Sequence, residues 1–184
     1  MMEALATWIL TLMTSLAPST PWRATYPSTA LAFAASAVEK PLFDGQHGAA
    51  KTAALYVSIA WYEATMRPDA EGDCGSKDGR TVPSVAGRCP ADTIPRSFCI
   101  FQIGGSNLAG LGLTREEIQS DITTCVRAGN VMMRRSFTLC RARPIDDRLA
   151  WYAAGGPECG EKGSRESRHR MAKAAWLFRT EPPP

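Results

Sequence analysis

The chain has 184 residues, an apolar fraction of 45%, a charged fraction of 21% and a net charge of +3. This composition is typical of a globular protein, and five Trp and six Phe residues argue against a disordered chain. The small positive charge favours an anionic partner only slightly and gives no reason to expect nucleic-acid binding. The length fits one domain, residues 1–184, with a core of its own.

Residues 4–17 are mostly apolar and follow helical spacing. No lysine or arginine precedes Arg23, and Glu3 places a negative charge where a secretion signal carries a positive one. We therefore expect a helix docked on the core rather than a cleaved signal. With the proline-rich connector 18–27, this helix would form an N-terminal segment over residues 1–27. The apolar stretch is too short to span a bilayer, so no stable membrane insertion is expected.

Apolar periodicity and helix-start signals predict a mainly α fold. Helices are expected over residues 28–40, 49–66, 122–137, 144–154 and 164–178. Three N-caps are predicted for helices in this chain: Ser28, Asp121 and Thr114, the last in a capping box with Glu117. Residues 69–97 are predicted to form a long loop rich in glycine and proline, with room for a short hairpin.

Six cysteines are the strongest compositional signal: Cys74, Cys89, Cys99, Cys125, Cys140 and Cys159. No pair has the C-x-x-C spacing of a zinc site, and His47 and His169 lie far apart in the sequence. We therefore expect no metal site and predict disulfides in an oxidising compartment, with buried free thiols as the alternative. Cys74–Cys89 is the best candidate, because it closes a short loop rich in glycine and proline. The pairing of the other cysteines is left open.

The segment IAWYEATMRP, residues 59–68, ends an apolar helix in an acid, Glu63. This position lies at the negative end of the helix dipole, and Trp61 and Tyr62 add apolar surroundings. Both effects raise the carboxyl pKa, and a carboxylic acid that keeps its proton near neutral pH is what cleavage of a glycosidic bond requires. From this segment alone, a glutamate that reaches solvent from a helix end is the simpler interpretation.

Further segments change that balance. The helix ending in Glu63 is followed by the glycine-rich loop, by SFCIFQIG (97–104), by a helix and by LAWYAAGG (149–156). This order resembles the soluble lytic transglycosylase and goose-type lysozyme-like family, in which a catalytic Glu ends a helix and G-L-M-Q-I and A-Y-N-A-G motifs follow. The resemblance covers roughly residues 49–178. Family residue types are kept at Glu63, Gln102, Ile103, Tyr152 and Gly155. The chain departs from them at Ala64, Cys99, Phe101 and Ala153.

The resemblance implies a lysozyme-like fold whose long loop or small hairpin lies beside a substrate cleft. It implies cleavage of the β-1,4 bond between N-acetylmuramic acid and N-acetylglucosamine in peptidoglycan, without a cofactor. Glu63 would be the general acid and then the general base, and Gln102, Tyr152, Ser97 and Asp73 would bind substrate. Such a protein acts outside the cytoplasm. The missing secretion signal favours delivery by a phage particle or a secretion apparatus over ordinary export.

Two other functions are left open. A hydrolytic lysozyme positions a water molecule, generally with a second carboxylate, for which Asp73, Asp78 and Asp92 are candidates. A non-catalytic wall-binding or particle-structural protein on the same fold is favoured by Ala64 and Ala153, which replace polar family residues. The cationic residues near the C-terminus are expected on a solvated helix face: Lys162, Arg165, Arg168, His169, Arg170 and Lys173.

Overall fold

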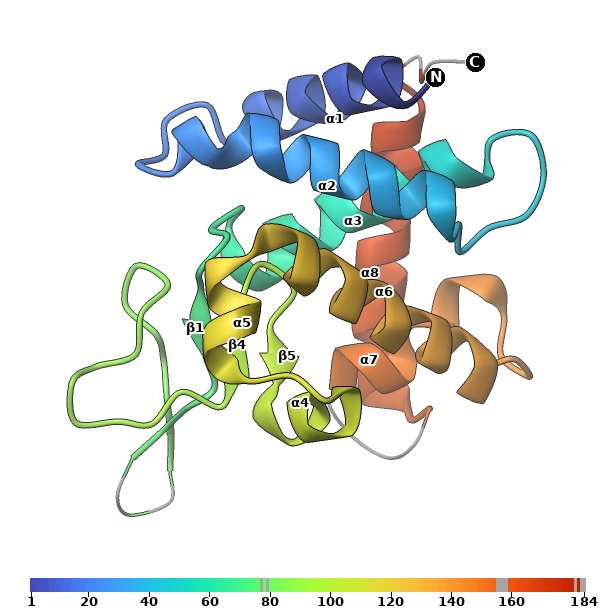
Figure 1. Ribbon diagram of the computed structural model, residues 1–184. Helices are drawn as coiled ribbons and strands as arrows, with labels where there is room; N and C mark the ends of the chain where they lie inside the picture. The colour runs from blue at the N-terminus through green and yellow to red at the C-terminus, as the bar shows by residue number, and fades with distance from the viewer. Residues whose placement is uncertain (77, 79, 155–158, 181, 183–184) are drawn as a thin grey trace.

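The computed structural model describes residues 1–76, 78, 80–154, 159–180 and 182, and it confirms the mainly α class (Figure 1). In chain order the α-helices are α1 (Met2–Leu16), α2 (Tyr26–Glu39), α3 (Gly48–Ala64), α4 (Gly105–Leu111), α5 (Arg115–Ser120), α6 (Ile122–Leu139), α7 (Ala150–Ala154) and α8 (Glu161–Phe178). Short 3-10 turns are η1 (Arg23–Thr25) and η2 (Ile145–Asp147). The strands are β1 (Glu71–Gly72), β2 (Cys74–Gly75), β3 (Thr81–Val82), β4 (Ser97–Phe98) and β5 (Ile103–Gly104).

Helix α3 forms the centre of the molecule. Its side chains are buried almost without interruption from Ala50 to Ala60, and it packs against α1, α2 and α8. Figure 1 shows α1 and α2 side by side near one end of α8, with the small strands and the loop 69–97 on the other side of the molecule. A helix that is apolar on all sides belongs in the interior, so its sequence pattern already predicted this position.

Helix α1 is docked on the core, as its apolar spacing predicted. Its buried residues Ile9, Leu12 and Met13 lie in the core cluster shared with α2 and α3. The Trp8 indole donates a hydrogen bond to the Thr180 carbonyl at 2.9 Å, which joins α1 to the segment after α8. Among the described residues, no helix is both long and apolar enough to cross a membrane.

The segment of the chain between α3 and α4 forms two small antiparallel sheets. In the first, with strand order β1-β4-β5, Phe98 pairs with both Glu71 and Ile103. In the second, β2 and β3 form a hairpin in which Cys74 lies opposite Val82. The loop 69–97 therefore contains the short hairpin for which the sequence left room. The first sheet places the residues that follow α3 beside the SFCIFQIG segment.

All six cysteines form disulfides. The predicted Cys74–Cys89 bond is confirmed and closes the loop that contains the hairpin. Cys99–Cys125 joins the turn after β4 to α6, and Cys140–Cys159 joins the end of α6 to the segment before α8. Disulfides of this number belong to proteins of oxidising, extracytoplasmic environments.

The helix expected from Ser28 begins earlier, at Tyr26. Pro27 accounts for the difference, because its fixed φ suits the first turn of a helix, where its missing N–H is not needed. Ser28 is therefore not an N-cap, and its hydroxyl donates to the Thr25 carbonyl at 2.9 Å. The caps predicted further along the chain are confirmed: the capping box of Thr114 and Glu117 starts α5, and Asp121 caps α6.

The prediction of a single helix over residues 144–154 is wrong, because the structure has two separate elements in this range, η2 and α7. Ser167 of α8 stabilises the break. Its hydroxyl donates to the Asp146 carbonyl at 2.6 Å and accepts from the Leu149 N–H at 3.1 Å, so backbone groups between the two turns are satisfied by a side chain. Helix α8 also begins at Glu161, three residues before the predicted start.

Candidate functional site

The end of α3 is shaped by two consecutive residues in the left-handed region, Thr65 (φ 47°) and Met66 (φ 64°). The Met66 N–H bonds to the Ala60 carbonyl at 3.0 Å, as in the Schellman motif that closes many helices, and the Met66 side chain is buried. The Trp22 indole donates to the Thr65 carbonyl at 3.1 Å. These contacts hold the last turn of α3, and with it Glu63, in one position.

Glu63 forms an ion pair with Arg170 of α8. The Arg170 Nη2 and Nε atoms lie 2.6 Å and 3.0 Å from the same carboxylate oxygen, Oε1. One fifth of the Glu63 side chain is exposed, compared with 8% for Arg170. The acid therefore does not simply extend into solvent from the helix end, which was the simpler interpretation of its sequence segment.

Opposing effects set the pKa of Glu63. Burial raises it, and this effect outweighs the charge and hydrogen bonds of Arg170, which lower it. The negative charges of Asp73 and Glu166 raise it further, so the pKa of Glu63 lies above its ordinary value. The raised pKa expected from the sequence is confirmed in direction, although its environment includes a cation that the sequence did not predict.

Glu63 lines a groove of about 870 Å³. The walls come from the loop after β1, from the segment 101–107, from α6 and from α7. Lining residues with functional groups include Asp73, Gln102, Arg135, Trp151, Tyr152 and Lys162. The SFCIFQIG and LAWYAAGG segments, far apart in the sequence, therefore meet Glu63 at one groove. Gly155, at the end of the second motif, lies outside the described residues.

Gln102 lies on the groove wall, but both ends of its amide are bonded within the protein. Its Oε1 accepts from the Ser97 hydroxyl at 2.8 Å, and its Nε2 donates to the Cys99 carbonyl at 3.0 Å. A Cβ atom at Gly72 would lie 1.9 Å from Oε1 of Gln102, so a larger residue where β1 passes this amide would displace it. Ser97 is buried and is not among the residues that line the groove. In this arrangement Ser97 supports Gln102, and substrate contact by either residue stays a prediction.

Tyr152 borders the groove next to Glu63, although its hydroxyl bonds elsewhere. The hydroxyl donates to the Phe101 carbonyl, which joins α7 to the turn before β5. Burial raises the pKa of Tyr152 well above its ordinary value, and the negative charge of Glu63 adds to this. Tyr152 therefore remains a neutral phenol that orders the groove wall.

Asp73 is the second carboxylate of the groove. The other two candidates lie elsewhere: Asp92 is exposed, and Asp78 is exposed and paired with Arg80. The negative charge of Asp73 contributes to the raised pKa of Glu63. Of the three predicted candidates, the structure therefore places only Asp73 at the groove with Glu63.

Backbone strain gathers around the groove. The described non-glycine residues with positive φ are Thr65, Met66, Asp73, Ala86, Cys99 and Gln102. Asp73 and Gln102 line the groove, Thr65 and Met66 follow Glu63 at the end of α3, and Cys99 lies in the turn before Phe101. A left-handed conformation costs such a residue roughly 1–2 kcal/mol, and residues of this kind cluster at functional sites. Cys99 keeps this conformation where the resemblance places a glycine.

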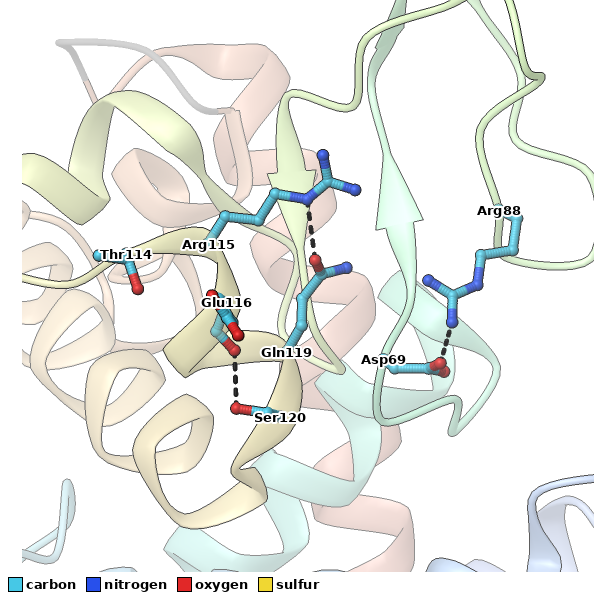
Figure 2. Close-up of a pocket in the computed structure, with 7 residues that line it drawn as sticks. All are labelled: Asp69, Arg88, Thr114, Arg115, Glu116, Gln119 and Ser120. Atoms are coloured by element: carbon cyan, nitrogen blue, oxygen red, sulfur yellow. Dashed lines mark hydrogen bonds and ion pairs between the residues drawn. The ribbon is translucent and has the colours of Figure 1, made fainter.

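A second hollow, of about 520 Å³, lies between α5 and the loop 69–97 (Figure 2). Figure 2 shows Arg88 directed at Asp69, and Arg115 directed at Gln119 of the same helix. Arg115 also pairs with Glu71 at 2.6 Å. Because both arginines are engaged by protein carboxylates, this hollow is a structural junction and the groove at Glu63 is the better candidate site.

The sequence did not predict the partner of Glu63 or the cations that line the groove. Arg170 was expected on a solvated helix face, but it is 7% exposed and bonded to Glu63. Arg135 of α6 lies 4.9 Å from the centre of the Trp151 ring, and Lys162 lines the groove from α8. The spacing of Arg170 from buried Met171, Ala174 and Leu177 was the available signal, since it lies on their side of α8.

Within the described parts of the chain, no three His, Cys, Asp or Glu residues are grouped as metal ligands would be. In comparisons with known proteins, no family model, no curated protein and no solved structure matches this chain. A proposal for the function of this protein therefore has to be argued from the geometry of the groove.

Proposed function

We propose that the protein cleaves peptidoglycan glycan strands between N-acetylmuramic acid and N-acetylglucosamine, as a lytic transglycosylase. The main support is the partly buried carboxyl of Glu63, which has a raised pKa and lies on the wall of an open groove. The same groove receives residues from the two other segments that carry the family resemblance. A lysozyme-like domain that acts outside the cytoplasm is part of this proposal.

Glu63 would act twice in the reaction. Its protonated carboxyl gives a proton to the glycosidic oxygen, and the bonding electrons leave with that oxygen. The carboxylate then takes a proton from the muramic acid 6-hydroxyl, whose oxygen bonds to the anomeric carbon. The product is an anhydro sugar, no water is consumed, and Glu63 ends the cycle protonated. A raised pKa suits the first step, because the acid must hold its proton until the bond breaks.

Clearing of purified cell-wall sacculi tests this proposal. Glu63→Gln keeps the shape of the side chain but cannot supply the proton, so we expect the clearing rate to fall by about 100-fold or more. Glu39→Gln is the matched control, because Glu39 also ends a helix but is exposed and does not line the groove. A wild type that sediments with sacculi without cleaving them would instead support the non-catalytic alternative.

Asp73 is the observation that favours a second candidate, a hydrolytic lysozyme. It shares the groove with Glu63, and a carboxylate there could hold the attacking water. Mass spectrometry of released muropeptides separates the two reactions, since a reducing end is one water heavier than an anhydro end. We expect anhydro ends from the wild type and also from Asp73→Asn. Asparagine suits this test because it tolerates the left-handed backbone of residue 73. Reducing ends that disappear in Asp73→Asn would establish hydrolysis.

A further inference from the structure

Arg170 uses all three guanidinium nitrogens on two carboxylates. Nη2 and Nε donate to Oε1 of Glu63. Nη1 donates to the backbone carbonyl of Glu166 at 2.9 Å and to the side-chain Oε2 of the same residue at 3.2 Å. The guanidinium carbon also lies 5.7 Å from the centre of the Tyr62 ring. Arg170 is 7% exposed, so its geometry is set on several sides.

The two bonds to Glu63 reach only one of its oxygens. Among the described residues, no hydrogen bond is made to the other oxygen, Oε2. An oxygen that accepts two N–H groups from a cation is a poor place for a proton, because the proton would be close to those hydrogens. The proton of the neutral acid is therefore directed to Oε2.

We propose that Arg170 is a positioning residue for Glu63: it holds Oε1 and leaves Oε2 to give and take the proton. Arg170 also stabilises the carboxylate that forms when the proton passes from Oε2 to the glycosidic oxygen. Glu166 holds the far side of the guanidinium and so keeps both of its nearer nitrogens on Glu63. The catalytic meaning of this arrangement rests on the proposed function, but the arrangement itself is a property of the folded protein.

Several charged or titratable groups surround Glu63. Arg170 and Glu166 belong to α8, Asp73 to the loop after β1, and Tyr152 to α7. Arg135 of α6 and Lys162 of α8 are cations that line the groove. Arg170 lowers the pKa of Glu63, whereas Glu166 raises it. Neutralising either residue should therefore move the titration of Glu63, and the two shifts should have opposite directions.

The experiment titrates Glu63 directly and then measures cleavage. Protein with ¹³C-labelled glutamate carboxyl groups is followed by NMR against pH, and Glu63→Gln identifies the Glu63 signal. We expect Arg170→Gln to move the Glu63 midpoint to higher pH. Glu166→Gln should move it to lower pH, and because Glu166 is partly exposed, this variant tests the proposal even if Arg170→Gln does not fold.

The same shifts should appear in the pH dependence of sacculus cleavage. Because the acid must be protonated, the rate falls above the Glu63 pKa, so this limb should move up in Arg170→Gln and down in Glu166→Gln. Arg170→Lys keeps the charge but loses the planar fork. It should leave the limb near its wild-type position while kcat falls by roughly 10- to 100-fold with little change in KM.

Midpoints of Glu63 that coincide in the wild type, Arg170→Gln and Glu166→Gln would overturn the proposal, as would shifts in the same direction. If Arg170 had a purely structural role, Arg170→Gln would reduce the folded fraction, and the NMR midpoint of Glu63 would not move in Arg170→Gln or in Glu166→Gln. If the midpoints move as expected but the wild type leaves sacculi intact, the proposed function fails and the positioning of Glu63 stands. If sacculi are cleaved and the midpoints do not move, the reverse holds.

Discussion

Glu63 takes its chemistry from residues supplied by other elements. Its place in the last turn of α3 brings it to the groove wall, and burial raises its pKa. Arg170, which approaches from α8, opposes that rise and orients the carboxyl. An isolated glutamate at a helix end would meet the dipole alone, whose effect is a fraction of a kcal/mol at an exposed site. The neighbours of Glu63, more than its helix, therefore determine its pKa.

The pH dependence of stability tests this picture at the residue scale. Because the folded-state pKa of Glu63 is raised, its stabilising contribution is complete below the ordinary glutamate pKa and is lost as the pH rises through the raised value. Glu63→Gln resembles the protonated acid at every pH. The free energy of unfolding of the wild type should therefore fall relative to Glu63→Gln as the pH rises. Urea unfolding over a series of pH values measures this, and a wild type that gains on the variant would contradict it.

At the scale of elements, the loop 69–97 is fastened to the helices by charge. Glu71 of β1 accepts from Arg115 of α5 at 2.6 Å and from the Cys89 N–H at 3.1 Å, and Arg88 lies 3.4 Å away. Burial raises the pKa of Glu71, but these hydrogen bonds and charges outweigh it and lower the pKa overall. These contacts attach the loop 69–97, whose first residues form part of the groove wall, to α5.

Removing the charge of Glu71 should loosen this attachment. We expect Glu71→Gln to lower the free energy of unfolding by about 1–3 kcal/mol, because Arg115 and Arg88 lose a partially buried partner. The lowered pKa means that this contribution is present above the ordinary glutamate pKa and is lost as the pH falls through the lowered value. Denaturant unfolding near neutral pH measures the loss, with the exposed Glu116→Gln as control. Equal losses in the two variants would show that Glu71 is not the anchor.

At the scale of the whole molecule, disulfides connect the parts that surround the groove. They join the loop 69–97 to itself, the turn before Gln102 to α6, and the end of α6 to the approach to α8. A disulfide is generally understood to stabilise a fold by restricting the unfolded chain, and loops of similar length should contribute similar amounts.

Two paired variants test the contribution of the disulfides. Replacing Cys74 and Cys89 by alanine, or Cys140 and Cys159, opens loops of 15 and 19 residues. We expect each pair to lower the free energy of unfolding by about 3 kcal/mol. Mass spectrometry after alkylation, with and without prior reduction, verifies the bonds themselves. Protein kept under oxidising conditions should take up alkylating reagent only after reduction, and six thiols alkylated without it would exclude the disulfides.

Features that depend on near neighbours in the chain were predictable from the sequence. The apolar runs of α1 and α3, the caps at Thr114 and Asp121, and the short Cys74–Cys89 loop are read within a few turns of chain. Glu63 was likewise identified as a candidate acid from the residues of its own helix, which also led us to expect its raised pKa. The order of the motifs led to the hypothesis of a common site, although their spacing could not show which side chains face the groove.

Contacts between residues distant in sequence could be identified only from the folded structure. Arg170 lies 107 positions from Glu63, and although its spacing places it on the buried side of α8, nothing in its sequence neighbourhood names Glu63 as its partner. Ser167 divides the helix expected over 144–154 because its hydroxyl bonds backbone groups of another element. Ser97 and Cys99 form hydrogen bonds with the side-chain amide of Gln102. Of the acids in the loop 69–97, only Asp73 lines the groove. Each outcome depends on where a separate segment packs, and local propensity and spacing do not determine that packing.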